Sequence, residues 1–163
     1  AVRHIILTLT VLLSTCFLAF TTSAQTSLSL GGFSADSNAP IEMSADKLTV
    51  SQSDGAAQFE GNVIIAQGGI RLAASVVVVA YLEAGGIDRL KASGGVTLVA
   101  QTESAEAETA EYDLTNRQLV MRGNVVLIQG QNAISADSMK IDLASGAAVM
   151  EGRVRTVLSS RSK

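Results

Sequence analysis

Hydrophobic and polar residues alternate along most of the chain in short runs that are separated by turn residues. In Phe59–Gly69 (FEGNVIIAQGG) and Met121–Gln131 (MRGNVVLIQGQ), apolar residues recur at every second position after the glycine. Val, Ile, Thr and Leu dominate these runs, whereas Gly, Asn, Asp and Ser fall between them. The pattern predicts β-strands with one buried face, and helices have almost no support beyond residue 24.

A phrase of the form apolar-x-Gly-x-Val occurs four times. Its glycines are Gly61, Gly94, Gly123 and Gly152, which are 33, 29 and 29 residues apart. A second phrase alternates with the first, and its anchor residues are Asp46, Ser75, Glu108 and Asp137. The longer interval in both series comes from extra residues around 82–89. An internal period of this size predicts a fold built from stacked repeats of about 29 residues.

The alternation within the second phrase slips by one residue, for example at Asp46–Lys47 and after Ala136. Such a slip moves every later side chain to the other face unless the strand bends or bulges there. Four equivalent slips therefore predict four stacked corners, where glycines let the opposite wall approach. We assign the structural corners to Asp46, Gly61, Gly94, Gly123, Asp137 and Gly152.

A sheet that turns a corner at one level folds over on itself and encloses an apolar trough. Twelve apolar residues are expected to line it, although ordinary core packing would explain each one equally well: Leu48, Val50, Phe59, Val63, Ile65, Leu72, Val77, Val125, Leu127, Ile134, Met139 and Ile141. The first and last strands of the stack keep unpaired backbone groups, and these edges are templates for a strand from a partner or a second copy.

The first 24 residues have the layout of a secretory signal peptide. Arg3 and His4 precede an apolar run over residues 5–20, and small residues lead to a predicted cleavage site after Ala24. Cys16 raises a lipoprotein alternative, but the residues before it form a poor lipidation motif. We expect a flexible segment over 25–39, one β-domain over 40–158 and a basic tail over 159–163.

Composition excludes much of enzyme chemistry after this predicted cleavage. The remaining chain contains neither Cys nor His, so thiol chemistry, His general-base catalysis and Cys/His zinc sites have no residues to perform them. Ser44 and Lys47 match an S-x-x-K motif, but they fall at a strand corner and its companion motifs are absent. We predict a protein that is not an enzyme and needs no cofactor.

An acidic cluster offers the remaining metal candidate. Glu103, Glu106, Glu108 and Glu111 could bind calcium weakly, but their spacing on a strand is explained more simply by a solvated outer face. We therefore predict no metal site.

Charge is divided unevenly along the chain. Residues 25–113 contain twelve acidic and four basic residues, whereas residues 114–163 contain three acidic and seven basic ones. This division is either drift or a sign that opposite ends of neighbouring copies attract each other. No basic patch is interleaved with aromatic residues, so nucleic-acid binding is not expected.

The phrases IEMSADKLTV, FEGNVIIAQGG, RGNVVLIQGQ and ISADSMKIDL resemble the OstA-like repeats of the LptA family, periplasmic lipopolysaccharide-transport proteins of Gram-negative bacteria. The resemblance spans residues 40–158 and implies an all-β fold, a twisted open β-jelly roll of antiparallel strands. It also implies that lipid A acyl chains bind inside the roll in the periplasm. The implied partners are an LptC-like inner-membrane protein, an LptD-like outer-membrane protein and further copies joined head to tail.

Several alternatives share these signals. An LptC-like protein would keep an N-terminal membrane anchor, and the N-terminal part of an LptD-like protein would precede a large β-barrel. A β-helical polysaccharide-processing enzyme would need a column of carboxylates, which Ser75 interrupts between Asp46 and Glu108. A self-assembling β-stack without lipid cargo is the simplest competitor.

Overall fold

The computed structural model describes residues 27–29, 33–34, 36 and 38–159, so the predicted signal peptide lies outside the described residues. Almost all of the described chain is strand. The strands are β1 (Ser27–Ser29), β2 (Ile41–Ser44), β3 (Lys47–Ser51), β4 (Ala56–Gln67), β5 (Ile70–Tyr81), β6 (Ile87–Ala100), β7 (Glu103–Asp113), β8 (Gln118–Gln129), β9 (Asn132–Asp142), β10 (Ala147–Glu151) and β11 (Arg155–Val157).

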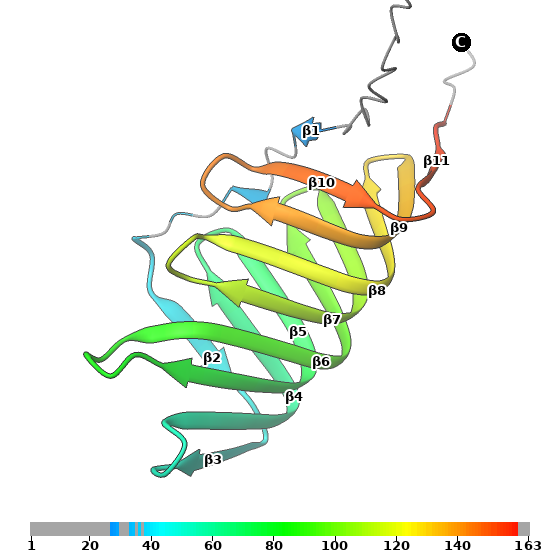
Figure 1. Cartoon of the computed structure of the whole chain (residues 1–163). Coiled ribbons are helices and arrows are strands. Elements are labelled where there is room, and N and C mark those ends of the chain that lie inside the picture. Colours follow the sequence, from blue (N-terminus) through cyan, green and yellow to red (C-terminus); the bar gives the residue numbers. More distant parts are fainter. Residues whose placement is uncertain (1–26, 30–32, 35, 37, 160–163) are drawn as a thin grey trace, which may run out of the picture.

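The strands form one antiparallel sheet in which neighbours along the chain are mostly neighbours in space (Figure 1). Its order is β1-β10-β9-β8-β7-β6-β5-β4-β2, while β3 also pairs with β4 and β11 also pairs with β9. Each end of the meander thus carries two short strands, β2 and β3 at one end and β10 and β11 at the other, and β1 lies outside β10. The predicted all-β, stacked antiparallel jelly roll is confirmed.

The sheet is divided into two halves because the register shifts midway along each long strand. On β4 and β5, for example, pairing is interrupted between Glu60 and Val63. Sheet half A contains β3, β10 and residues 56–60, 76–80, 89–93, 109–113, 118–122 and 138–142. Sheet half B contains β2, β11 and residues 63–67, 70–74, 96–100, 103–107, 125–129 and 132–136. The strands bend between the halves, and the halves face each other.

The bend at the first corner depends on a glycine. Gly61 has φ of 78°, and a Cβ built on it would lie 2.5 Å from Oδ2 of Asp46. Asn62 follows with φ of 46°, a left-handed conformation that Asn tolerates better than most residues. Its Nδ2 donates to Oδ2 of Asp46 at 2.8 Å, and the Asp46 backbone N–H donates to the Gly61 carbonyl at 2.9 Å. One acidic side chain therefore ties the two sides of the corner together.

The same arrangement recurs up the stack with different partners. Glu108 accepts from Nδ2 of Asn124 at 2.7 Å, and Asp137 accepts from Nε of Arg153 at 2.9 Å. At the second corner, where Ser75 replaces the acid, its hydroxyl donates to the Gly94 carbonyl at 2.7 Å. The hydrogen-bond partners at the corner thus differ between successive repeats of the stack (its rungs), while the close approach of glycine to the facing side chain is kept.

The described N-terminal residues differ from the expected flexible segment. β1 pairs with β10 through Ser27–Val149, Leu28–Ala148 and Ser29–Ala147, and Phe33 is completely buried. Its ring belongs to the same hydrophobic cluster as the strands. The domain therefore includes described residues before position 40, because the long apolar face of the sheet accepts an aromatic side chain from outside the repeats.

The last repeat also departs from the expected pattern. The alternation places Val154 on the inner face with Val63, Val96 and Val125, yet 53% of its surface is exposed, whereas the other three are buried. The chain bends after Gly152, and no further rung covers Val154 among the described residues. Val154 occupies the same position in the repeat as the three buried valines, but it stays exposed because no neighbouring strand covers it.

Two adjacent glycines allow the close approach at a corner to be tested separately from backbone strain. Gly94 and Gly95 have φ of 80° and 84°, but only at Gly94 would a Cβ collide with Ser75, at 2.6 Å from its Cβ. We expect Gly94→Ala to destabilise the protein by about 1–3 kcal/mol more than Gly95→Ala in urea unfolding. Equal losses in the two variants would contradict the packing explanation.

Candidate functional site

The inner face of the roll is organised as continuous ladders of apolar side chains. Residues paired directly across antiparallel strands point to the same face. One ladder crosses the whole of sheet half A: Leu48, Phe59, Val77, Ala92, Ala110, Met121, Met139 and Met150. A side chain at each step therefore contacts the next rung, and the ladder runs from one end of the stack to the other.

Two further ladders complete most of the inner surface. The second on sheet half A is Val50, Ala57, Val79, Leu90, Tyr112, Leu119, Ile141 and Ala148. The ladder on sheet half B is Met43, Ile65, Leu72, Leu98, Ala105, Leu127, Ile134 and Thr156. Val63 and Val125 lie on the inner face beside the corners and are fully buried. The structure thus places all twelve predicted lining residues on one face.

The twelve residues nevertheless differ in exposure. Leu48 and Val50 expose 53% and 64% of their surface, because they lie on β3, which has a paired neighbour on one side only among the described strands. Phe59 and Ile134 are half-buried, and the remaining eight are buried. The apolar trough is open at its first rung and closed in its middle.

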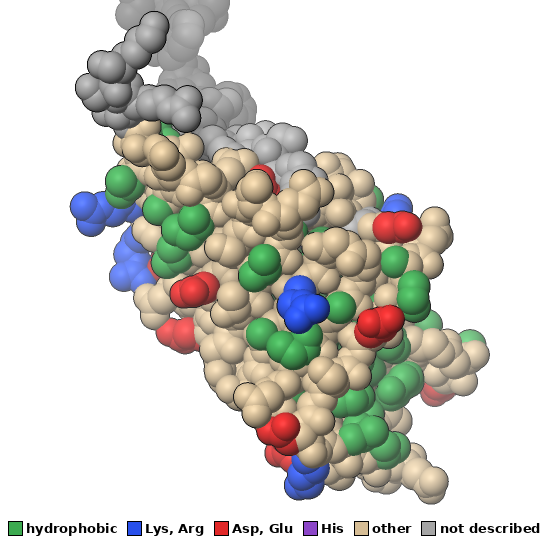
Figure 2. All heavy atoms as spheres, turned by 180° about the vertical axis from the view of Figure 1, so that it is seen from behind, with side chains coloured by type: hydrophobic (Ala, Val, Ile, Leu, Met, Phe, Trp, Pro, Cys, Tyr) green, Lys and Arg blue, Asp and Glu red, His purple; other side chains and the backbone are tan. Residues whose placement is uncertain are grey.

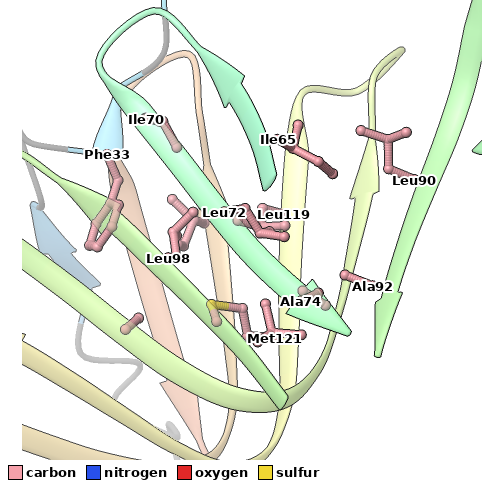
Figure 3. Packing of buried hydrophobic residues seen from close by; sticks show 14 of the residues in the cluster. Phe33, Ile65, Ile70, Leu72, Ala74, Leu90, Ala92, Leu98, Leu119 and Met121 are labelled. Carbon is pink, nitrogen blue, oxygen red and sulfur yellow. The ribbon is translucent and has the colours of Figure 1, made fainter. Parts of the chain in front are cut away.

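The middle of the lumen is well packed. A cavity of about 40 Å³ remains there, lined by Ile41, Ile65, Gln67, Ile70, Leu72, Leu90, Ala92, Leu98, Ala110, Tyr112, Leu119 and Leu143. For comparison, an engineered apolar cavity that holds benzene has a volume of roughly 150 Å³. The lumen has the chemistry of a hydrocarbon site but, in this conformation, not the space. Figure 3 shows Leu72, Leu98 and Leu119 converging from different strands.

Polar side chains gather on the inner face at the rim of sheet half B. The rim pairs place Gln67 opposite Ile70, Ala100 opposite Glu103, and Glu103 opposite Gln129. Nε2 of Gln129 donates to Oε1 of Glu103 at 2.8 Å. Oε2 of Glu103 is buried and has no hydrogen-bond partner. The mouth of the lumen therefore carries polar side chains, whereas its interior is apolar.

The prediction that four glutamates lie on a solvated outer face is wrong for one of them. Glu103 is only 6% exposed and points inward, whereas Glu106 and Glu108 are exposed and Glu111 is half-buried. Glu103 and Glu106 are three positions apart on a strand, so they cannot share a face. That odd spacing is the signal by which the sequence separates them.

Tyr112 supplies a hydroxyl at the cavity wall. It donates to Oε1 of Gln67 at 3.4 Å. Burial raises the pKa of the Tyr112 phenol above its ordinary value, and the charge of Arg117 partly opposes this shift. The hydroxyl therefore stays neutral and available as a donor throughout the physiological range.

Charged pairs lie at the two ends of the stack. Nζ of Lys47 is 3.1 Å from Oε2 of Glu60 at the first rung, and its hydrogen bond holds the pKa of Glu60 below its ordinary value. At the last rung Arg153 holds the pKa of Asp137 low in the same way, and the pair raises the pKa of Arg153. A hollow of about 290 Å³ beside this pair is lined by Val125, Val126 and Arg155, among others. The last rung thus ends in an uncovered, positively charged corner.

The predicted set of lining residues left out several residues at the centre of the lumen. Leu98, Met121 and Val96 are almost completely buried there, and the alternation of the sequence places them on the same face as the predicted set. Phe33 is different, because it lies outside the repeats and nothing in the periodicity of the sequence marks it.

Metal and membrane sites are not evident in the described part of the chain. No group of three or more Asp, Glu, His or Cys side chains among those residues is arranged to hold a metal ion. Nor do they form a helix of the length and hydrophobicity that crossing a bilayer requires.

The sequence of this folded-over sheet matches the model of a known family. The sequence model of the family described as "LptA/(LptD N-terminal domain) LPS transport protein" matches residues 42–147. The chain belongs to this family. Its members are transport proteins and not enzymes, in agreement with the sequence-based prediction.

Two individual comparisons extend this result. A protein of uncharacterised function from Rhizobium meliloti (strain 1021) is 33% identical over 115 residues, which cover 65% of this chain and 62% of that protein. The chain therefore matches less than two thirds of that relative's length. The crystal structure of LptH, the LptA-homologous periplasmic component of the lipopolysaccharide transport device of Pseudomonas aeruginosa, superposes with a TM-score of 0.69. It covers 77% of this chain and 99% of LptH at 18% identity, a likeness of fold.

Adjacent residues on β6 test whether the lumen is a packed core. Leu98 is 1% exposed inside the roll and Val99 is 42% exposed outside it. We expect Leu98→Ala to lower the free energy of unfolding by about 2–5 kcal/mol, because it deletes buried methyl groups and leaves a cavity. Val99→Ala should change it by less than about 0.5 kcal/mol. Similar losses for both variants in urea unfolding would show that the inner face is misassigned.

Proposed function

We propose that this protein is a periplasmic carrier of lipopolysaccharide, which shields the acyl chains of lipid A in its lumen. The observation that carries this proposal is the set of apolar ladders running unbroken through the stack. Membership in a family of lipopolysaccharide-transport proteins supports it. An N-terminal signal peptide cleaved after Ala24 would deliver the protein to that compartment.

The lumen suits flexible hydrocarbon chains. Its lining is aliphatic, with Met121, Met139 and Met150 on one ladder, and methionine side chains adapt to irregular shapes. Each methylene group removed from water contributes roughly 0.8 kcal/mol, so partial insertion of several acyl chains would hold the lipid. The polar rim at Gln67, Glu103 and Gln129 would face the head-group end.

The first test uses two isoleucines that differ only in direction. Ile65 is buried and lines the lumen cavity, whereas Ile64 is half-buried on the opposite face of β4. With benzoyl-phenylalanine at each position in turn, we expect lipopolysaccharide to crosslink at residue 65 and not at residue 64. Absence of a lipid adduct at both positions in folded protein would refute the carrier and favour a β-stack scaffold without cargo.

The ends of the roll support a bridge between membranes. At the β3 end of the stack, Leu48 and Val50 are the last residues of two inner ladders and are exposed. At the other end Val154, Val157 and Leu158 are exposed by 53%, 58% and 70%. Figure 2 shows hydrophobic side chains gathered towards the lower right, at the end of the stack that carries β3. A second roll stacked end to end would cover these residues and extend the trough.

Within the proposal, the partners at the two ends are LptC-like and LptD-like proteins or further copies of this chain. Each would add a strand to a free edge of the stack. β1, β2, β3 and β11 each have one paired neighbour among the described strands, and β1 occupies the edge of β10.

A charge on the first rung should block head-to-tail association. We expect Val50→Lys to lower the oligomer fraction in sedimentation velocity, because a lysine in the continuing trough would be buried without a partner. Val99→Lys is the control, since Val99 is exposed on the outside of central strand β6. If Val50→Lys associates as strongly as the control, β3 is not the edge that is used.

A further inference from the structure

One carboxyl oxygen at the rim of sheet half B lacks a hydrogen-bond partner. It belongs to Glu103, which begins β7 and is only 6% exposed. Oε1 of Glu103 accepts from Nε2 of Gln129 at 2.8 Å, whereas Oε2 is buried without a partner. In the described part of the chain it is the only buried side-chain oxygen or nitrogen of which this is true. An ionised carboxyl group can only accept hydrogen bonds, so Oε2 is an unused acceptor.

This unpaired oxygen is unfavourable for the closed roll. Burial removes the water that would solvate a carboxyl oxygen, and the loss is recovered only when a donor replaces that water. The neighbouring positions of the same rim row on β5 and β6 are Ile70 and Ala100, which are buried without such a loss. Stability of the fold alone therefore does not account for a carboxyl group at position 103.

Glu103 lies where the inner face changes from apolar to polar. β7 is the fifth of nine strands in the sheet order, so this part of the rim is midway along the stack (Figure 1). Ala105, two residues further along the same face of β7, belongs to the apolar ladder of sheet half B. Ala105 and Ala100, which is paired with Glu103, are both completely buried. The carboxyl group is thus flanked by short side chains and stands one step outside the hydrocarbon surface.

We propose that Glu103 selects the cargo by accepting a hydrogen bond from an amide N–H or a hydroxyl group at the point where an acyl chain joins its head group. This inference rests on the proposed carrier function. With acyl chains inserted between the ladders, this junction lies at the rim. In lipopolysaccharide, acyl chains are attached to an amino sugar partly through amide groups, which supply such donors.

The same contact discriminates against lipids without a donor. The ester groups of a phosphatidylcholine accept hydrogen bonds but cannot donate them, and its head group carries no donor either. Entry of this lipid therefore leaves Oε2 of Glu103 unpaired. A site that contains a buried hydrogen-bonding group rejects the ligand that cannot satisfy it.

Competition between the two lipids measures this selection. Benzoyl-phenylalanine at residue 65 reports on lipopolysaccharide in the lumen, and phosphatidylcholine is added as the competitor. In Glu103→Met, an unbranched apolar side chain of similar length replaces the carboxyl group. We expect the phosphatidylcholine concentration that halves the lipopolysaccharide adduct to fall roughly ten- to hundredfold relative to the protein with Glu103. Glu106→Met is the matched control, because Glu106 is exposed on the outer face of the same strand. Its competition curve should be unchanged.

A second variant changes the hydrogen bonding without changing the size of the side chain. In Glu103→Gln, Nε2 of Gln129 still requires an acceptor, so the amide oxygen of the new side chain should face Gln129. The amide nitrogen then takes the place of Oε2 and presents a donor where the cargo needs an acceptor. Phosphatidylcholine should again compete at a concentration that is lower by roughly tenfold or more.

Thermal unfolding separates selection from a structural role. Glu103→Met removes the unpaired buried oxygen, and Gln129 is half-buried, so its amide can bond to water instead. We therefore expect the Tm of this variant to be unchanged or higher. A glutamate with a purely structural role would give a lower Tm and unchanged competition, which would overturn the selection.

The outcomes distinguish this inference from the carrier function itself. Suppose that lipopolysaccharide crosslinks at residue 65, but phosphatidylcholine competes equally well with Glu103 and with both of its variants. Selection by Glu103 would then be overturned and the carrier would stand, and an equal gain in Glu106→Met would have the same meaning. No lipid adduct at residue 65 in folded protein would overturn the carrier, and the role of Glu103 with it. Crosslinking, with stronger competition in the two Glu103 variants alone, supports both.

Discussion

Everything in this structure depends on the close approach of a glycine to the side chain that faces it at each corner. At Gly61 and Gly123 any Cβ would collide with Asp46 or Glu108, so only glycine lets the strand bend there. The acid is then anchored by the asparagine that follows the glycine, at 2.8 Å and 2.7 Å. Repetition of this contact at each level converts a flat meander into two facing halves. Without it the apolar face would lie open to water.

Folding over creates a surface that serves two purposes. The inner ladders supply the burial that stabilises the domain, and the same side chains form the wall of the proposed lipid path. This dual use explains why the lumen is nearly full in the free protein. An empty trough lined by Val, Leu, Ile and Met would expose a large apolar area, which is unfavourable for a protein in water. Packing of the walls and burial of Phe33 solve this problem without a ligand.

The two ends of the stack, in contrast to its middle, leave apolar side chains uncovered. A stack of rungs has a first and a last member, and each keeps an apolar face and a strand edge that a next rung would cover. Leu48 and Val50 at one end, and Val154 at the other, are exposed for this reason although their equivalents inside the stack are buried. The edge of β10, by contrast, is paired with β1 from the same chain. The two ends of the protein are therefore not equivalent.

Local pattern in the sequence was enough to predict the strands beyond residue 40, the four corners and the face on which the twelve predicted lining residues lie. Each follows from alternation, glycine spacing or a one-residue slip, and these are properties of a few neighbouring positions. Exposure of Leu48 and Val50, the 40 Å³ that remain in the lumen and the burial of Phe33 were decided by the tertiary structure. These features depend on which rung or segment, distant in the chain, comes to lie against the residue. The repeat period of the sequence does not indicate which distant residue that neighbour is.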